Sequence, residues 1–375
     1  MKQNNMIFFV LLSVLIFVSG CLGGNSKDKT LSDIHIGFDG INMEFIKGTP
    51  PPNTFEKSSF PIGLSIKNIG TYSVNYDSNS ATKTADESAV LLLNVEKDYN
   101  CVDSFDGSGN FFAISDNVNK CSIDKNSIQK IKFGIDGKTE FNPKGYEETV
   151  MFNVITKQLE PQSESHSSSL SATLCYPYET RFTDTACIDT DILGARFKQK
   201  VCKSEDKSYP KGQGAPVAIT KVESRMLDKD NKIIPNFIIH IENKGNGNVI
   251  KRRNDAQETT PPQATQMSNI DEVCSSKRLD PADRDFNTVV LRAYLGAETP
   301  DNELDCEPKK TPEDKGREGY VRLVGNKDII RCSLPENIAV NKNTQPYTSP
   351  LIIILDYGYM SSISAKYAIE RSVVE

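Results

Sequence analysis

The stretch LCYPYETRFTDTACI, residues Leu174–Ile188, and the stretch LDYGYMSSISAKYAI, residues Leu355–Ile369, decide the fold of this chain. Four of the fifteen aligned positions are identical, and they include both tyrosines of a Tyr-x-Tyr pair. Successive side chains of a strand point to opposite faces, so Leu174, Tyr176 and Tyr178 share one face. The sequence predicts two equivalent strands whose tyrosines pack in a core and bond backbone groups through their hydroxyls. The alternative is an aromatic binding platform.

A second pair of motifs precedes these strands in the same order. Residues 68–70 read Asn-Ile-Gly, and residues 243–245 read Asn-Lys-Gly. The glycine accepts the backbone conformation that ends a strand, and the asparagine can bond its own backbone across the turn. Asn68 lies 108 residues before Tyr176, and Asn243 lies 114 residues before Tyr357. The matched order and spacing predict that the two halves of the chain are a duplication.

The composition is typical of a globular chain with a mild acidic excess. The chain has 375 residues, of which 37% are hydrophobic, and its net charge is −6. Because the chain has no excess of basic residues to neutralise phosphates, the composition argues against nucleic acid as its main partner. Short apolar or β-branched runs alternate with turn residues along most of the chain, including Leu170–Tyr178 and Leu351–Tyr359. The predicted fold is all-β, with β-sandwich domains in tandem.

The polar stretch KSEDKSYPKGQGAP, residues Lys203–Pro216, separates the two strand-rich halves and is the natural boundary. Within the first half, Pro177 cannot donate to a ladder and is expected at a sheet edge or at a strand end. The predicted organisation is a signal peptide at 1–20, a lipidated cysteine with its tether at 21–30, a first sandwich at 31–203, a linker at 204–216 and a second sandwich at 217–375.

The Asn-x-Gly strand, preceded by an apolar run, resembles the corresponding strand of CARDB-type and related immunoglobulin-like modules of prokaryotic, often archaeal, surface proteins. In the first copy, Pro50-Pro51-Pro52 and Phe55-Glu56-Lys57 precede the strand in a similar way. The resemblance covers about the first third of each half and implies two tandem immunoglobulin-like β-sandwich domains with long insertions in a surface protein. Each half is longer than the roughly 100 residues of a minimal sandwich, so extra strands or insertions are expected.

The N-terminus has the pattern of a lipoprotein signal peptide. Lys2 is followed by the thirteen-residue apolar run Met6–Val18, which is shorter than the about 20 residues that span a bilayer. The run ends in Val18, Ser19, Gly20 and Cys21, which resembles a prokaryotic lipobox. The resemblance implies cleavage before Cys21 and a lipid on its thiol, and two acyl chains anchor a protein stably. The alternatives are a membrane-anchoring helix or an ordinary secretory signal.

Eight cysteines follow Cys21, and an even number in an exported chain favours disulfides over reduced, buried thiols. The local pairings we expect are Cys101–Cys121, Cys187–Cys202 and Cys306–Cys332. This leaves Cys175 and Cys274 without an assigned partner. The eight disulfide candidates are Cys101, Cys121, Cys175, Cys187, Cys202, Cys274, Cys306 and Cys332.

Sites for chemistry are few. His35, His166 and His240 have no nucleophile motif around them, so we interpret them as structural or solvated. The oxygen-rich stretch that holds Asp103, Asp106 and Asn110 is a weak calcium-loop candidate, since it lacks the spacing of an EF-hand. An ordinary solvated turn is the favoured interpretation.

The basic run Lys251-Arg252-Arg253 is interpreted as a solvated strand end rather than an anion site. We expect no metal or other cofactor.

Together these patterns predict a non-enzymatic envelope lipoprotein that lies outside the cytoplasm and is anchored to the membrane through its N-terminal lipid. Its work would be binding, adhesion or scaffolding, with an unknown envelope protein or a glycan as partner. The alternatives are a ligand-capture lipoprotein for glycan or peptide, and a surface hydrolase.

Overall fold

The computed structural model describes residues 34–75, 88–107, 111–113, 128–196, 199–250, 252, 270, 274, 286–309 and 316–372. Ile34–Glu375 forms one compact unit. The described elements are strands joined by turns, with two short 3-10 helices, η2 (Pro300–Asn302) and η3 (Glu336–Ile338). The predicted all-β class is confirmed.

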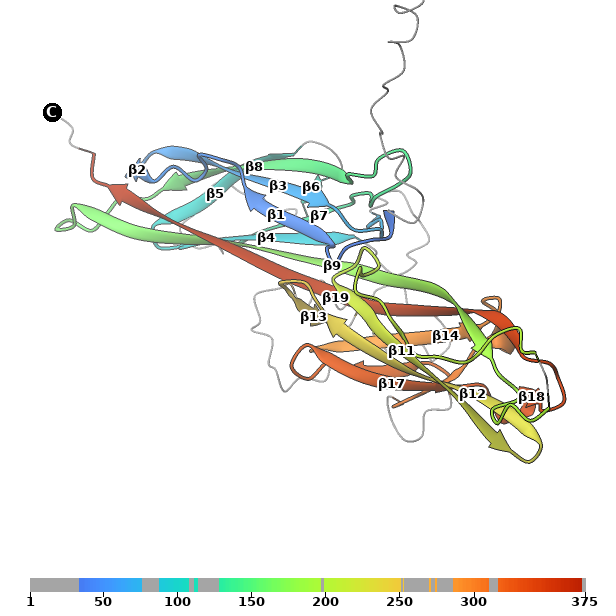
Figure 1. Ribbon diagram of the computed structural model, residues 1–375. Helices are drawn as coiled ribbons and strands as arrows, with labels where there is room; N and C mark the ends of the chain where they lie inside the picture. Colours follow the sequence, from blue (N-terminus) through green and yellow to red (C-terminus); the bar gives the residue numbers. More distant parts are fainter. Residues whose placement is uncertain are drawn as a thin grey trace, which may run out of the picture. The chain divides into compact units, whose positions relative to one another are not determined.

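The first sandwich is built from residues of the N-terminal half. One sheet has the order β1-β3-β8-β5, and the facing sheet contains β9, β4, β7 and β6 (Figure 1). Alternating apolar residues of both sheets meet in one core, with Ile62, Leu64 and Ile66 on β3 and Leu91 and Leu93 on β4 fully buried. The strands are β1 (Ile41–Phe45), β3 (Ser59–Asn68), β4 (Ala89–Val95), β5 (Asn100–Gly107), β6 (Phe111–Ala113), β7 (Ile128–Phe133), β8 (Tyr146–Thr156) and β9 (Ser165–Ile188).

The second sandwich repeats this plan. One sheet has the order β10-β11-β12-β17-β15, with β18 on β12, and the facing sheet has the order β16-β14-β19. Two further strands, β13 (Asn248–Ile250) and β2 (Asn53–Phe55), pair with β19. The other strands are β10 (Lys207–Ser208), β11 (Val217–Lys229), β12 (Lys232–Asn243), β14 (Thr288–Leu295), β15 (Asp305–Glu307), β16 (Gly319–Arg322), β17 (Lys327–Ser333), β18 (Val340–Asn341) and β19 (Tyr347–Glu370).

The strand order supports the predicted duplication. In chain order, β1, β3, β4, β5, β7, β8 and β9 correspond to β11, β12, β14, β15, β16, β17 and β19. With this correspondence, β1-β3-β8-β5 matches β11-β12-β17-β15, and β9-β4-β7 matches β19-β14-β16. The two Asn-x-Gly motifs end the equivalent strands β3 and β12. Seven strands in each half therefore occupy the same places.

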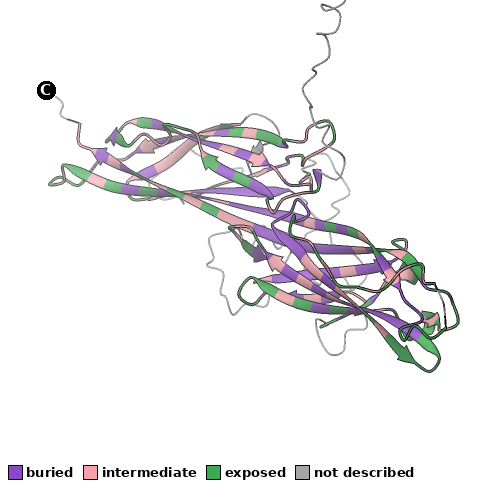
Figure 2. Cartoon of the chain, viewed as in Figure 1, coloured by how far each residue is buried: buried purple, intermediate pink, exposed green. Residues whose placement is uncertain are grey.

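The two sandwiches share their longest strands. β9 and β19 are each 24 residues long and pair antiparallel without interruption from Ser165↔Glu370 to Ile188↔Tyr347. At about 3.3 Å per residue each strand extends roughly 80 Å, so both run through both sandwiches (Figure 1). Figure 2 shows buried residues along both strands where the sandwiches meet. The hydrophobic core is accordingly one cluster that contains residues of both halves.

The register of this pair has an approximate two-fold centre. The duplicated tyrosines are 181 residues apart, as Tyr176 and Tyr357. In the ladder, Tyr176 lies opposite Tyr359 and Pro177 lies opposite Gly358, its own counterpart in the repeat. Each copy of the motif therefore pairs with the other copy around the Pro177–Gly358 position.

This sharing differs from the predicted domain boundaries, which assign each half of the chain to its own sandwich. The predicted linker at 204–216 is an ordered part of the second half. It contains β10, and Gly214 N–H donates to the Gly37 carbonyl at 2.9 Å while Gly37 N–H donates to the Lys211 carbonyl at 2.8 Å. Its polar composition reflects a surface position rather than freedom between domains.

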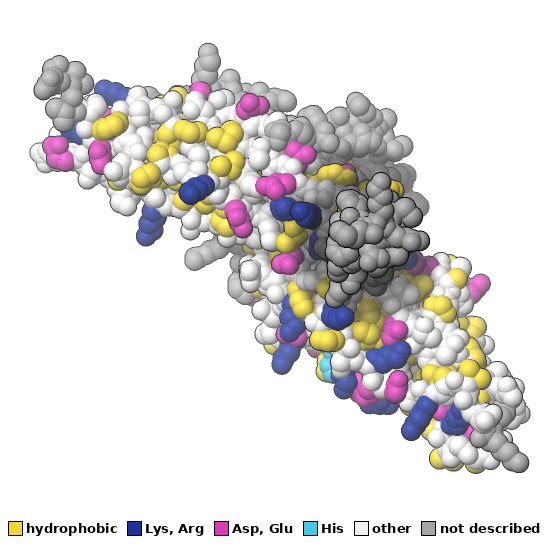
Figure 3. All heavy atoms as spheres, turned by 45° about the horizontal axis from the view of Figure 1, so that its top comes forward, with side chains coloured by type: hydrophobic (Ala, Val, Ile, Leu, Met, Phe, Trp, Pro, Cys, Tyr) yellow, Lys and Arg dark blue, Asp and Glu magenta, His cyan; other side chains and the backbone are white. Residues whose placement is uncertain are grey.

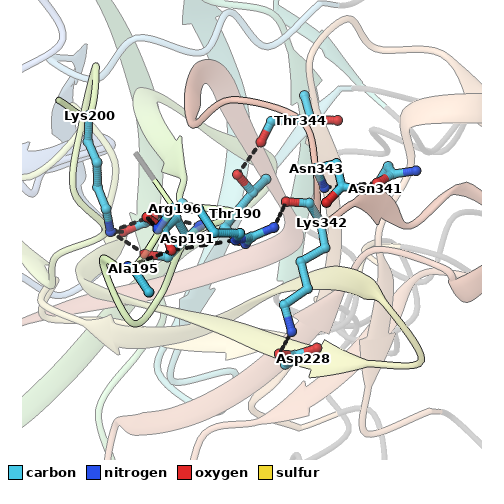
Figure 4. A network of polar contacts seen from close by, with 11 residues as sticks. Thr190, Asp191, Ala195, Arg196, Lys200, Asp228, Asn341, Lys342, Asn343 and Thr344 are labelled. Carbon is cyan, nitrogen blue, oxygen red and sulfur yellow. Dashed lines mark hydrogen bonds and ion pairs between the residues drawn. The ribbon is translucent and has the colours of Figure 1, made fainter. Parts of the chain in front are cut away.

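A polar network and a disulfide hold the loop that follows β9, at the far end of the second half (Figure 4). The Asp191 carboxylate accepts hydrogen bonds from the Ala195 N–H at 3.1 Å and the Arg196 N–H at 3.0 Å. The Arg196 guanidinium donates to the Lys342 carbonyl, and the Lys200 ammonium lies 2.9 Å from the Asp189 carboxylate. The loop is thereby fixed against the segment that leads into β19.

Candidate functional site

The centre of the β9–β19 pair, which we call the joint, is built from four tyrosines, one pair from each repeat. Tyr176, Tyr178 and Tyr357 are at most 1% exposed and Tyr359 is 3% exposed. Their rings contact one another across the ladder, with the centroids of Tyr176 and Tyr359 5.7 Å apart. The alternation of the strand places them between the sheets, as the sequence predicted. They form packing rather than an exposed aromatic platform.

Two of the tyrosines bind the turns that follow the Asn-x-Gly motifs. The Tyr178 hydroxyl donates to the Gly214 carbonyl at 2.8 Å and accepts from the Thr71 N–H at 3.0 Å. Its counterpart Tyr359 donates to Asn243 Oδ1 at 3.2 Å and accepts from the Gly247 N–H at 2.7 Å. The predicted partnership of tyrosine hydroxyls with backbone groups is confirmed in both halves.

The glycine of each motif makes room for these hydroxyls. A Cβ on Gly70 would lie 1.8 Å from the Tyr178 hydroxyl, and a Cβ on Gly245 would lie 2.2 Å from the Tyr359 hydroxyl. Both distances are far below van der Waals contact. The asparagine bonds the turn, since Asn68 Oδ1 accepts from the Gly70 N–H at 3.1 Å. Strand end and tyrosine therefore form one unit in each repeat.

The other two tyrosines bind the first strand of each repeat. The Tyr176 hydroxyl accepts from the Ile41 N–H at 3.1 Å, and the Tyr357 hydroxyl accepts from the Val217 N–H at 3.3 Å. Thr180 joins the second group, with its hydroxyl 2.7 Å from the Val217 carbonyl and 2.9 Å from the Tyr357 hydroxyl. The first strands β1 and β11 are thus fixed to the shared ladder.

Burial keeps these phenols neutral. Desolvation raises the pKa of Tyr176 and Tyr357 well above the usual value near 10, because the charged form would lose its hydration. Burial also raises the pKa of Tyr359 to about 12, partly offset by its hydrogen bond from Gly247. The neutral hydroxyls can donate as well as accept, which the network at the joint requires.

A buried ion pair crosses the joint. The Arg252 guanidinium donates to the Asp356 carboxylate on β19 at 3.0 Å and to the Tyr72 hydroxyl of the first half at 2.9 Å. The guanidinium carbon also lies 5.5 Å from the centre of the Tyr72 ring. The two charged side chains are 13% and 6% exposed. Removal of one partner would leave an uncompensated charge in a largely buried position, which is costly.

This pair corrects the interpretation of the basic run as a solvated strand end at Arg252, while Lys251 and Arg253 lie outside the described residues. Arg252 is the second residue after the end of β13, and the pairing of β13 with β19 brings it beside Asp356. A basic run gives no signal of a partner that lies more than a hundred residues away along the chain.

Three disulfides are described. Cys187–Cys202 and Cys306–Cys332 confirm two of the predicted pairings. The cysteines left without a partner, Cys175 and Cys274, bond each other across 99 residues. That pair lies in a small apolar cluster on the outer face of β9, which sequence spacing could not indicate. Disulfides of this number are typical of proteins that fold in an oxidising compartment.

Cys101 is also disulfide-bonded, but its partner lies outside the described residues. The predicted pairing with Cys121 therefore stays a prediction.

The calcium-loop candidates do not converge. Asp103 and Asp106 lie within β5, and a bulge at Asp103 interrupts its pairing with β8. Asp103 lies 3.4 Å from the Asn153 amide rather than beside other carboxylates. Asn110 lies outside the described residues. Within the part of the chain that the structure describes, no three His, Cys, Asp or Glu side chains are placed to hold a metal ion.

The histidines lack the contacts of a catalytic base. His166 Nε2 and the Ser168 hydroxyl both bond the same Glu96 oxygen, at 3.1 and 3.0 Å. The serine therefore bonds the carboxylate, not the imidazole that would have to activate it. His240 Nε2 lies 3.0 Å from the Glu223 carboxylate on the surface of the second half.

The lipobox residues Val18, Ser19, Gly20 and Cys21 lie outside the described residues, so the predicted anchor is untested. Among the described residues, no helix is long and apolar enough to cross a membrane.

A hollow beside β9 is a feature that sequence reasoning missed. It has a volume of about 720 Å³ and is lined by Arg181–Asp184 of β9 and by residues 208–213 of the opposite segment. The two walls meet where the segment that follows β10 packs against β9 through the Tyr209 and Phe182 rings, whose centroids are 4.6 Å apart. Elsewhere the surface mixes charges of both signs over both sandwiches, as one face in Figure 3 shows.

The sequence matches no protein-family profile and no curated protein. Among solved structures, one similar chain is from a cohesin–dockerin complex of Clostridium thermocellum. It is 11% identical and has a TM-score of 0.25, and the match covers 38% of this chain and 84% of that one.

A second similar structure is the pilus backbone protein of Streptococcus pneumoniae, which is 9% identical with a TM-score of 0.23. That match covers 89% of this chain and 50% of the other. The C-terminal domain of an antigen I/II-family protein from Streptococcus pyogenes is 6% identical with a TM-score of 0.17, over 90% and 98% of the two chains. At these values the likenesses carry no argument about function, which rests on the geometry.

Proposed function

We propose that this chain is a non-enzymatic envelope protein that holds a binding surface on a stiff, two-sandwich support, attached to the membrane by a lipid on Cys21. The observation that carries the proposal is the continuous β9–β19 ladder, which runs through both sandwiches without a break. A flexible linker between domains would let each sandwich move alone. Two shared strands instead couple the sandwiches through main-chain hydrogen bonds.

The hydrogen bonds at the joint favour a stiff connection between the sandwiches. Hydrogen bonds from four buried tyrosines reach β1, β11 and both Asn-x-Gly turns, so bending at the joint would break bonds in both halves at once. The ion pair between Arg252 and Asp356 adds a contact that tolerates only one arrangement. A stiff module of this kind suits scaffolding or adhesion, in which a surface is presented at a fixed distance.

The disulfides support an extracytoplasmic location, and the lipobox resemblance supports the anchor. Binding rather than catalysis is favoured because the described polar clusters are satisfied structural networks. Surface modules with a CARDB-type likeness would fit this role.

Intact mass of the native protein, extracted from its own membranes, tests the attachment. The proposal predicts the mass of residues 21–375 plus a lipid, with a rise of about 8 Da on reduction, or roughly 2 Da for each of four disulfides. In the same host, Cys21→Ala should release the protein from the membrane, whereas the matched control Ser26→Ala should not. A mass that retains residues 1–20, or a membrane-bound Cys21→Ala variant, would contradict the anchor.

A further inference from the structure

Among the described strands, none pairs with the outer edge of β9 in the second sandwich. Along that edge β4 pairs only with Leu170–Cys175, and beyond it no described strand pairs with Tyr176–Ile188. The equivalent edge of β19 is covered at three places, by β14, by β13 at Gly358–Met360 and by β2 at Ala368–Glu370. The β19 equivalents of Arg181–Thr183, which are Ser362–Ser364, likewise have no described partner strand on that edge, so the same stretch is open in both copies of the repeat.

The register identifies which main-chain groups face outward. Thr185 lies opposite Pro350, which has no N–H to give to the ladder. The Thr185 N–H is bonded to the Asp184 carboxylate at 2.7 Å, and its carbonyl accepts from the Lys207 ammonium at 2.8 Å, so both groups point away from β19. Because the two orientations alternate in an antiparallel ladder, the N–H and carbonyl groups of Thr183 and Arg181 also point outward.

These outward groups are unpaired within the described part of the chain. No backbone hydrogen bond is formed at the outer edge by Arg181 or Thr183. They face the 720 Å³ hollow, whose volume falls in the range of sites that bury a ligand. An edge with unpaired donors and acceptors is a template for another strand.

The hollow adds a place for one apolar side chain. Phe182, 5% exposed, packs edge-on against the Tyr209 ring with 4.6 Å between centroids, and both line the hollow. A strand added to β9 would direct alternate side chains toward this aromatic pair, as β9 itself does. An apolar residue at such a position would bury its surface there.

The charge at the hollow is unbalanced toward positive. The Asp184 carboxylate is already bonded by the Lys207 ammonium at 3.0 Å and by the Tyr209 hydroxyl at 2.6 Å, and these bonds help to hold its pKa below the usual range despite partial burial. Arg181 is paired with Glu298. Lys211, which lines the hollow, has no carboxylate partner among the described residues.

We propose that the outer edge of β9 at Arg181–Thr183 is a docking site for an extended peptide segment of a partner protein. The segment adds to the sheet as a strand, places one apolar side chain against Phe182 and Tyr209, and places an acidic residue near Lys211. Main-chain bonds supply the affinity, and the hollow and the lysine supply the selectivity. This inference does not depend on the lipid at Cys21.

The test uses a phage-displayed library of short random linear peptides, selected against the full chain. We expect enrichment of peptides that alternate apolar and polar residues and carry a carboxylate. Thr183→Pro removes the outward N–H and places a ring at the edge, and it should weaken the selected peptides roughly tenfold to a hundredfold. The matched control Thr183→Val keeps the N–H and should bind within about twofold of the native chain.

Proline is compatible with this position, since Pro177 has the same outward orientation within β9 and Pro350 lies in the same orientation on β19. An unchanged melting temperature of Thr183→Pro verifies that the fold is kept. Lys211→Glu should remove the preference for acidic peptides without loss of binding to neutral ones.

Three results would overturn the proposal. One is a selection that enriches no peptide, and another is peptides that bind Thr183→Pro as tightly as the native chain. The third is self-association of the native chain that Thr183→Pro abolishes, because it would assign the edge to a second copy.

Discussion

The hydroxyl of Tyr178 offers a direct perturbation of the joint. Tyr178→Phe keeps the buried ring and removes the donor to the Gly214 carbonyl and the acceptor for the Thr71 N–H. The change therefore removes two hydrogen bonds of ordinary length. Each is worth about 1 kcal/mol net, which gives a predicted loss of about 2 kcal/mol.

The predicted shift in melting temperature follows from the size of the folded unit. An unfolding entropy of about 2.1 cal/mol/K per residue over roughly 340 residues makes 2 kcal/mol equivalent to about 3 °C. Calorimetry under oxidising conditions measures it. Since the ladder couples the halves, we expect one transition that moves as a whole. A loss below about 0.5 kcal/mol, or two transitions of which only one moves, would refute the reasoning that the hydroxyl fixes a joint common to both sandwiches.

Three further predictions concern the same architecture. Gly245→Ala should destabilise the fold, and Tyr359→Phe in the same chain should recover part of the loss because the clashing hydroxyl is gone. The free energies of unfolding of both single variants and of the double variant test this, and additive losses would contradict it. The half-buried Cys187–Cys202 bond should be the first of the described disulfides that a mild reductant opens, and its loss should lower the free energy of unfolding by about 3 kcal/mol for its 15-residue separation. Mass spectrometry would show the order of reduction, denaturant unfolding would measure the loss, and earlier reduction of a buried pair would argue against this prediction. Stability should fall as the pH rises above about 10, because the unfolded chain releases phenol protons that the folded chain retains up to about pH 12 at Tyr359. Absorbance titration of the phenolates measures this release, and tyrosines that all ionise near pH 10 without unfolding would contradict the prediction.

Much of the fold could be predicted from local patterns. The Tyr-x-Tyr and Asn-x-Gly motifs mark packing positions, and packing positions repeat when a fold is duplicated. The extent of the shared strands could not be predicted. The expected strand Leu170–Tyr178 is the middle of a 24-residue strand, because the polar residues that follow it, such as Arg181 and Thr183, point to the solvent face.

Local sequence patterns also cannot predict that one copy of the motif pairs with the other, because the pattern of a strand does not identify the strand beside it. For Pro177, the sequence predicts an edge or a strand end, and the edge is what the structure has: Pro177 lies in mid-strand with its nitrogen on the outer edge, beyond the last residue that pairs with β4. The Cys175–Cys274 bond, the Arg252–Asp356 pair and the hollow beside β9 all join segments far apart in sequence, so only the tertiary structure reveals them.

The central claim, that the sandwiches are coupled through the joint, is tested most directly by hydrogen exchange of the native protein followed by peptide mass spectrometry. The amides of Tyr176 and Tyr178 on β9 and of Tyr357 and Tyr359 on β19 point into the paired ladder, and overlapping peptides that contain these residues report their exchange. The account predicts that they exchange only through global unfolding, as slowly as the cores of both sandwiches. Faster exchange at the joint, while both cores stay protected, would show a hinge there and contradict the account.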